Sequence, residues 1–430
     1  MRIIALIAGA LLIGTLVRPR ATFAQAPAAP TPAALTLAQL ITTADQRNPA
    51  ITAARQAVVA ADARIALARS GFGPTVTASG STGTSGTSTG TGTQGFSSSA
   101  SIGASYVLYD SGQIALSIRQ AEANAKAARL SLEATRQDIA LSVATNYVGI
   151  LRAERNVTLR QQLVVQNQEL VRLAEGQFRA GVVPRADIVR AQAGLAAAEG
   201  ELIAARNAVD VTKAQLNVAV GQPAATLVAV APPPPVPRLT LAAAALSALV
   251  DERPEVRRAM AEIEAAELGL AVAQVSNGLR VTLNGNASQG ITGSSGTTWS
   301  ITSTVGLPVS DAGRSTAQVT EATANLEAAR ARIETTRLSV QQQSLQALLS
   351  LLDARARLES ARAGLAFAQE SLRLAQGRYA AGAGAFLEVI DAQTALANAE
   401  QTLARAEYDE VAAVLTLRHS VGRSVVDGVI

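Results

Sequence analysis

The sequence contains no cysteine, a single histidine and only 3% aromatic residues. Without cysteine the chain can form no disulfide, no thiolate metal site and no lipid-modified N-terminal cysteine. The lone histidine, His419, suits a packing or surface role better than a catalytic or metal-binding one. We therefore expect a protein that is not an enzyme, with no catalytic, cofactor-binding or metal site.

Long hydrophobic runs are also scarce. The one such run, Ile3 to Val17, follows Arg2 and leads to small residues around Ala24 and Ala26. This pattern predicts a secretory signal peptide over residues 1–24, cleaved after Ala24 or Ala26. Because no other run is long enough to span a bilayer, only β-strands could carry the exported chain across a membrane.

An excess of charge of one sign is missing as well. The formal net charge of +4 includes three arginines of the leader, so that only +1 remains after its removal. A high isoelectric point from so small an excess indicates no nucleic-acid partner.

The chain is rich in Ala, Leu, Val, Gln and Arg, which is typical of closely packed helices and not of a large globular core. The pattern from Gln113 to Phe178 has no proline and predicts a helix of roughly 100 Å. A helix of that length cannot fold back into one compact globule. The turn Gly181 to Pro184 breaks it, and the helical pattern resumes through Val220.

Two Gly/Ser/Thr-rich stretches predict β-hairpins, at about 74–110 and about 279–310. Apolar and small polar residues alternate in both, which gives each strand one apolar and one polar face. The alternation fits a soluble hairpin packed on its own helices, and it also fits membrane strands with lipid on the apolar face. Tyr106, Tyr109 and Trp299 lie near strand ends, where an interfacial aromatic girdle is expected.

The two hairpins belong to an internal repeat. The sequence divides into a first repeat (25–230), a Pro-rich linker (231–238) and a second repeat (239–430). Gly73 corresponds to Gly278 at an offset of 205, and from Asp110 and Asp311 onward the offset is 201. The four missing residues fall in the hairpin loop, where a structural repeat is expected to vary.

Several motifs carry a family resemblance when they are taken together. They are Asn48-Pro49, Arg253-Pro254, Phe72-Gly73-Pro74, Tyr109-Asp110-Ser111-Gly112-Gln113, Phe178-Arg179-Ala180-Gly181 and Leu387-Glu388-Val389-Ile390-Asp391-Ala392-Gln393. The chain resembles the outer-membrane efflux protein family (TolC-like outer-membrane factors) from about Leu37 to Gly422. The resemblance implies a mainly α fold with a membrane β-barrel. In it, a homotrimer forms a 12-stranded barrel that a periplasmic α-helical barrel continues.

The same resemblance implies the function and the partners. Members are passive exit ducts of tripartite efflux or type I secretion systems in the outer membrane of Gram-negative bacteria, with a large periplasmic portion. The implied partners are outer-membrane lipid, a periplasmic adaptor (membrane fusion) protein and an inner-membrane RND, MFS or ABC transporter. The sequence leaves drug, metal and protein cargo open.

Strand geometry agrees with sharing of the barrel between chains. Four strands leave open edges, which lipid cannot satisfy, so several chains must contribute. Two chains would give eight strands and a filled interior, whereas three would give twelve strands and room for a pore.

By resemblance, the helix–helix turns form the constricted periplasmic end. The positions matching the family's aperture are Asp187, Tyr379, Glu388 and Asp391. Glu388 and Asp391 share a helical face, and three copies would form acidic rings that favour cations. The alternative reading is a solvated helix start, where acids interact favourably with the helix dipole.

One position departs from the family pattern, because Gly384 stands where some members carry a basic latch residue. We hypothesise that Arg185 or Arg190 replaces that latch by pairing with Glu388 or Asp391 across neighbouring hairpins.

The alternative function from another class is a trimeric coiled-coil surface or structural protein without channel activity. The matched amphipathic hairpins argue against it, because a stalk does not need them and their apolar faces would be exposed.

Overall fold

The computed structural model describes residues 34–85, 95–231, 249–292, 296–381 and 383–423. The predicted signal peptide, the linker beyond Ala231 and the loops of both hairpins lie outside the described residues. Statements about those segments stay predictions.

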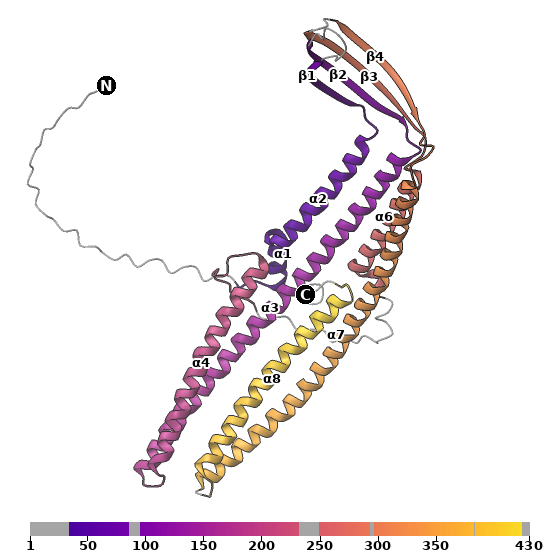
Figure 1. Cartoon of the computed structure of the whole chain (residues 1–430). Helices are drawn as coiled ribbons and strands as arrows, with labels where there is room; N and C mark the ends of the chain where they lie inside the picture. The colour runs from indigo at the N-terminus through magenta and orange to yellow at the C-terminus, as the bar shows by residue number, and fades with distance from the viewer. Residues whose placement is uncertain (1–33, 86–94, 232–248, 293–295, 382, 424–430) are drawn as a thin grey trace, which may run out of the picture. The chain divides into compact units, whose positions relative to one another are not determined.

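The described chain is mainly helical (Figure 1). The helices are α1 (Leu37–Arg47), α2 (Pro49–Ser70), α3 (Gln113–Arg179), α4 (Arg185–Val220), the 3-10 turn η1 (Val250–Glu252), α6 (Pro254–Val275), α7 (Arg314–Ala380) and α8 (Phe386–Ser420). Helices α3 and α7 have 67 residues each, which corresponds to roughly 100 Å. None of the described helices combines the length and the apolarity needed to cross a bilayer.

The strands form one antiparallel sheet in the order β1 (Thr75–Ser85), β2 (Gly95–Tyr109), β3 (Arg280–Thr292) and β4 (Thr297–Gly306). Each strand joins one helix, and α2, α3, α6 and α7 pack side by side in the same order as their strands. Farther from the sheet, α4 replaces α2 beside α3, and α8 replaces α6 between α3 and α7. The sheet and the helices that continue it form one curved layer, which we call the wall (Figure 1). It is four elements wide along its described length.

The apolar core lies along the seams between these helices. Its largest cluster joins α1, α3, α4 and α8 through buried residues such as Leu40, Val143, Leu216 and Leu415. Tyr147 belongs to this cluster, and its hydroxyl donates to the carbonyl of Ala231. The long helices thus depend on neighbours, not on intrinsic helix propensity, for their stability.

In both repeats a side chain connects the end of the last helix to the start of an earlier one, α4 to α2 in the first repeat and α8 to α6 in the second. The buried Asn48 donates from Nδ2 to the carbonyl oxygen of Ala219 at 2.7 Å, in the last turn of α4. In the second repeat the buried Arg253 donates to the carbonyl oxygen of His419, in the last turn of α8. Two different side chains therefore satisfy helix carbonyls that would otherwise lack partners.

An Asp-X-Gly turn connects a strand to a long helix in each repeat. Ser111 and Ala312 have φ values of 57° and 54°, and the glycines that follow are also left-handed. Asp311 accepts from the amides of Gly313 at 3.1 Å and Ser315 at 2.8 Å. Asp110 caps α3 in the same way. The carboxylate accepts hydrogen bonds from amides at the helix start that would otherwise lack partners, and this offsets the cost of two consecutive left-handed residues.

This cap predicts a loss of stability in acid. Hydrogen bonds, first from Ser315 and then from Asn277 and Gly313, lower the pKa of Asp311 to about 2 from 3.8. Because the pKa of Asp311 is lower in the folded than in the unfolded state, its ionised form stabilises the fold at a pH above the unfolded-state pKa. This contribution is lost as the pH falls from about 4 to about 2. The Asp311→Asn variant should have a lower melting temperature than native protein at pH 7. Its melting temperature should also fall less than that of native protein between pH 4 and pH 2. Thermal melting followed by circular dichroism across this range tests it.

The control for this measurement is Asp391→Asn, which changes an exposed carboxylate with no described hydrogen bond or ion pair. An equal acid-dependent loss in native protein and Asp311→Asn would contradict the prediction.

Candidate functional site

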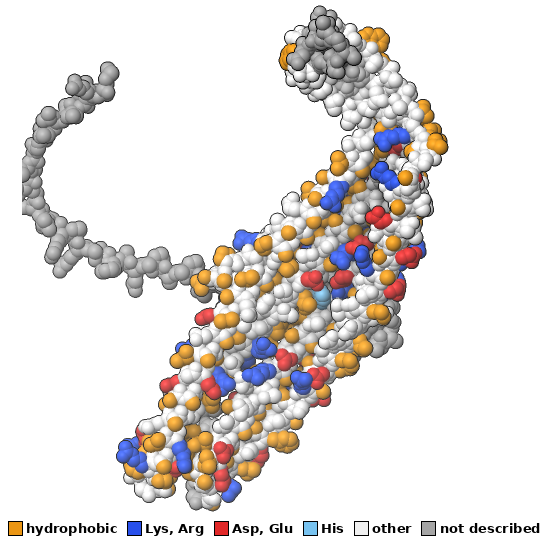
Figure 2. Space-filling model, in the orientation of Figure 1, with side chains coloured by type: hydrophobic (Ala, Val, Ile, Leu, Met, Phe, Trp, Pro, Cys, Tyr) orange, Lys and Arg blue, Asp and Glu red, His pale blue; other side chains and the backbone are white. Residues whose placement is uncertain are grey.

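The sheet has two chemically different faces. The register places Val76, Ile102, Leu283 and Ile301 on one face, with glycine and alanine between them. The other face consists mainly of Ser, Thr, Asn and Gly, joined by cross-strand hydrogen bonds such as Ser79 to Ser101 at 2.8 Å. Figure 2 shows the sheet nearly free of charged side chains on the side it presents, whereas the helices carry many. A sheet of this kind can separate an apolar phase from a polar one.

The three predicted interfacial aromatics lie on the apolar face. Tyr106 pairs with Leu283 and Tyr109 with Val281, close to the helices, and Trp299 pairs with Ala287 toward the hairpin ends. All three side chains are exposed, Trp299 most of all at 75%. Their role at a membrane interface stays a prediction.

The wall has two free edges. Among the described residues, β1 and β4 are unpaired on their outer sides. In the same part of the chain, α4 packs mainly on α3 and at its end on α1, and α7 packs mainly on α6, α8 and η1. Both helices carry a second apolar stripe on the side opposite their packed one, at helical spacing. The exposed members are Val189, Ile203, Val211 and Val218 on α4, and Leu338, Leu345, Leu349, Leu352, Phe367 and Leu374 on α7. Two different edges that need covering favour a closed ring of copies.

The helix–helix turns lie at the end far from the sheet (Figure 1). Gly181 ends α3 with a φ of 75°. Gly384 packs against the preceding helix, where a Cβ atom would lie 3.1 Å from the backbone nitrogen of Tyr379. A side chain at this position would therefore be tightly packed against the end of α7. Residue 382 of the predicted turn lies outside the described residues.

A small core joins the two helical hairpins at this end. Buried residues from all four helices form it: Leu170, Ala174, Ala191, Ala375, Phe386, Val389 and Ala392. The Tyr379 and Phe386 rings pack with centroids 5.5 Å apart. The two hairpins of one chain are therefore held together at their tips by a modest apolar contact.

Two of the predicted aperture residues meet in this region. The Tyr379 hydroxyl donates to Oε1 of Gln177 on α3, which ties α7 to α3. Burial, and secondarily the charge of Asp187, raises the pKa of Tyr379. Asp187 is only 8% exposed and pairs with Arg190 one turn later at 3.5 Å. Sequence reasoning missed Gln177, which has no signature beyond its place one turn before the break.

The other two aperture residues lie on α8. Glu388 pairs with Arg378 of α7 at 3.2 Å, whereas Asp391 is exposed. Within the described chain, neither Arg185 nor Arg190 bonds to Glu388 or Asp391, since Arg190 pairs with Asp187. The predicted latch therefore stays a prediction for contacts between copies, and Arg378 is a basic residue that sequence reasoning missed.

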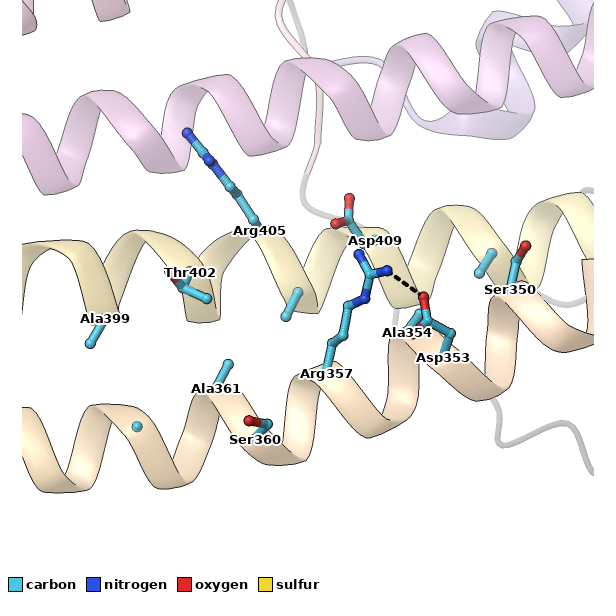
Figure 3. A pocket seen from close by; sticks show the side chains of 13 residues that line it. Ser350, Asp353, Ala354, Arg357, Ser360, Ala361, Ala399, Thr402, Arg405 and Asp409 are labelled. Carbon is cyan, nitrogen blue, oxygen red and sulfur yellow. Dashed lines mark ion pairs between the residues drawn. The ribbon is translucent and has the colours of Figure 1, made fainter.

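A groove of about 820 Å³ runs between α7 and α8 (Figure 3). Small and charged residues line it at intervals of three and four: Ser350, Asp353, Arg357, Ser360 and Gly364 on α7, and Ala399, Thr402, Ala406, Asp409 and Ala413 on α8. Arg357 and Asp353 form an ion pair of 2.7 Å at its rim. Among the described residues, no group of three or more His, Cys, Asp or Glu side chains could hold a metal ion.

Comparison with known proteins identifies this architecture. A family model described as "Outer membrane efflux protein" matches residues 40–222 and 245–423, which is most of the chain. The chain belongs to this family. The predicted resemblance and fold class are confirmed, with long helices and β-hairpins in two repeats.

The individual relatives of this chain are distant in sequence. Nodulation protein T of Rhizobium leguminosarum bv. trifolii is 24% identical over 271 residues, which cover 60% of this chain and 58% of that protein. A membrane protein from Pseudomonas aeruginosa has a TM-score of 0.80 at 22% identity, covering 90% and 93% of the two chains. The open-state MtrE outer membrane channel of Neisseria gonorrhoeae has a TM-score of 0.76 at 21% identity, covering 90% and 89%. At these identities the structures establish the fold alone.

Family membership places this chain in the Gram-negative outer membrane, with its helical part in the periplasm. The family consists of channels, not enzymes, and its channels are trimeric. Three copies would supply twelve strands, and the free edges of α4 and α7 would close the ring.

Proposed function

We propose that the protein is the passive outer-membrane duct of a tripartite efflux or type I secretion system. The supporting observation is the continuous wall, in which a sheet with one apolar and one polar face leads into four helices with free apolar edges on both sides. Closed by three copies, this wall encloses a polar lumen and presents the apolar face of the sheet to lipid.

The proposed partners are a periplasmic adaptor and an inner-membrane RND, MFS or ABC transporter that supplies the energy. The α7–α8 groove supports docking of an adaptor, because its lining alternates at three and four residues as a helix surface does. Its ion pairs and small residues suit a helix that binds reversibly.

Two measurements test the proposal. Purified trimer in a planar bilayer should conduct ions, and affinity purification from cross-linked envelopes should recover an adaptor with a pump. A trimer with neither conductance nor adaptor would favour the structural-protein alternative.

The tip cluster is proposed as the closed aperture, and it gives a testable prediction. Tyr379→Phe removes the donor to Gln177 but keeps the ring packed on Phe386. Loss of one such hydrogen bond weakens the closed state by about 1 kcal/mol per chain, or about fivefold. We expect more frequent channel opening in bilayers and greater antibiotic leak in cells.

Tyr408→Phe makes the same change in a tyrosine far from the tip and serves as control. Arg185→Ala combined with Arg190→Ala tests the latch, which fails if opening and leak stay unchanged. Unchanged opening of Tyr379→Phe would exclude this tyrosine from gating.

A further inference from the structure

Of the charged residues in this chain, one lies in the four described strands. It is Arg280, the first residue of β3. The β3–β4 register runs without a shift from Arg280 opposite Gly306 to Gln289 opposite Thr297. Arg280 therefore shares the face of Thr282, Asn284 and the other polar residues, because side chains alternate along a strand.

The guanidinium of Arg280 has room and no described partner. The residue is exposed, and no hydrogen bond or ion pair of its side chain is found among the described residues. Gly306, directly opposite, has no side chain to cover it. The Asp311 carboxylate, near the end of β4, is engaged by the amides of its own turn. Asp110, which follows the Tyr109–Val281 pair, is held by the amides of its own turn in the same way. Both carboxylates keep their charge, but Arg280 forms no ion pair with either of them within the described chain.

The rest of the polar face offers no compensating charge in the described strands. Farther along the sheet toward the hairpin ends, neutral side chains form hydrogen bonds with one another, including Ser105 with Asn284 at 2.8 Å and Ser288 with Thr298 at 2.7 Å. The carboxylates proposed for the aperture, Glu388 and Asp391, lie at the opposite end of the helices. Arg280 and these two carboxylates therefore lie at opposite ends of the wall.

We propose that three Arg280 side chains form a positively charged ring where the barrel lumen meets the helical part, and that this ring favours small anions and anionic groups of cargo. The inference rests on the proposed duct, in which the polar face lines the lumen. At about 0.1 M salt the screening length is about 10 Å, so a ring of three charges acts over much of a barrel lumen.

The absence of cysteine makes a direct test possible. Arg280→Cys introduces a single thiol, and Val281→Cys places one on the neighbouring residue of the opposite face. Trimers are recorded in a planar bilayer under a KCl gradient, before and after adding a positively charged (ethylammonium) or a negatively charged (ethylsulfonate) methanethiosulfonate from the aqueous side.

Arg280→Cys is expected to lower the anion-to-cation permeability ratio at about 0.1 M KCl by about twofold or more. The positive reagent should restore the ratio and the negative reagent should lower it further. The difference in permeability ratio between native protein and the Arg280→Cys variant should be smaller at about 1 M KCl, where the screening length is about 3 Å. Val281→Cys should behave as native protein with either reagent.

The repeat supplies a gain-of-charge counterpart. Thr75 occupies the position equivalent to Arg280 and lies on the same polar face. Thr75→Arg should therefore raise the anion-to-cation ratio above that of native protein.

Failure of this inference is distinguishable from failure of the duct. Native trimers that do not conduct would overturn the duct, and the ring with it. If the thiol of the Arg280→Cys variant reacts in conducting trimers without a change in selectivity, the ring alone is overturned. If the thiol of Val281→Cys reacts and that of Arg280→Cys does not, the lumen faces the other side of the sheet, which also overturns the ring.

Discussion

Leu349→Asp combined with Leu352→Asp is expected to leave the protein monomeric. Both leucines lie on the α7 stripe that faces away from α8, and about half of each side chain is exposed in the single chain. In a closed ring this stripe is covered by the next copy, so six carboxylates would be buried without partners. Each costs about 1–3 kcal/mol when desolvated and unpaired, so the two carboxylates on each seam weaken it by about 2–6 kcal/mol.

The measurement is the mass of the detergent-solubilised protein by light scattering, with heat-stable oligomers on gels as a second readout. Ser350→Asp combined with Thr402→Asp adds the same charge, but in the groove between α7 and α8, and should leave the trimer intact. Ile203→Asp on α4 should also weaken the trimer, because the seam has two sides. A trimer that survives the Leu349 and Leu352 changes would place the contact between copies elsewhere.

Gly221→Ala is expected to produce a large loss of stability from a single methyl group. Gly221 ends α4 with a φ of 85°, and a Cβ atom there would lie 2.7 Å from the Arg47 carbonyl oxygen and 2.8 Å from Cα of Asn48. Left-handed backbone costs alanine about 1 kcal/mol, and an overlap with rigid backbone adds about 1–3 kcal/mol. The overlap also displaces Asn48, which holds the end of α4 through its bond to Ala219.

The second repeat supplies a matched control. Gly422 has a φ of 71°, but within the described part of the chain a Cβ atom there would meet only Arg253, at 3.5 Å or more, which is ordinary contact. Gly422→Ala should therefore show the conformational cost alone, about 1 kcal/mol. Thermal or denaturant unfolding compares the two, and equal losses would mean that the close approach at Gly221 is relieved by a shift of the backbone.

Much of the fold could be predicted because its periodicities are long and simple. The strand alternation and the uninterrupted helical patterns leave few other assignments, and the observed α3 begins at the predicted Gln113 and ends one residue after the predicted Phe178. The repeat offset then relates the two hairpins. Such signals depend on a residue's spacing from its neighbours and not on which distant segment it touches.

The tip contacts could not be predicted in the same way. Gln177 and Arg378 occupy equivalent repeat positions, yet one binds Tyr379 and the other binds Glu388. Their partners depend on how the two hairpins are placed against each other, which no local pattern encodes. Similarly, the periodicity of α7 contains two apolar stripes, and only the packing shows that Leu351 meets α8 while Leu352 stays free.

The constant number of elements in the wall has a consequence for width. Neighbouring strands lie about 4.8 Å apart, whereas packed helices lie about 8–10 Å apart. Four strands therefore cover roughly 19 Å of circumference per chain, and four helices roughly 36 Å, a difference that strand tilt reduces but does not remove. The perimeter must widen at the left-handed Asp110 and Asp311 turns, which link the strands to α3 and α7. In a trimer with its far end open, the barrel and not the helical chamber would set the largest solute that passes.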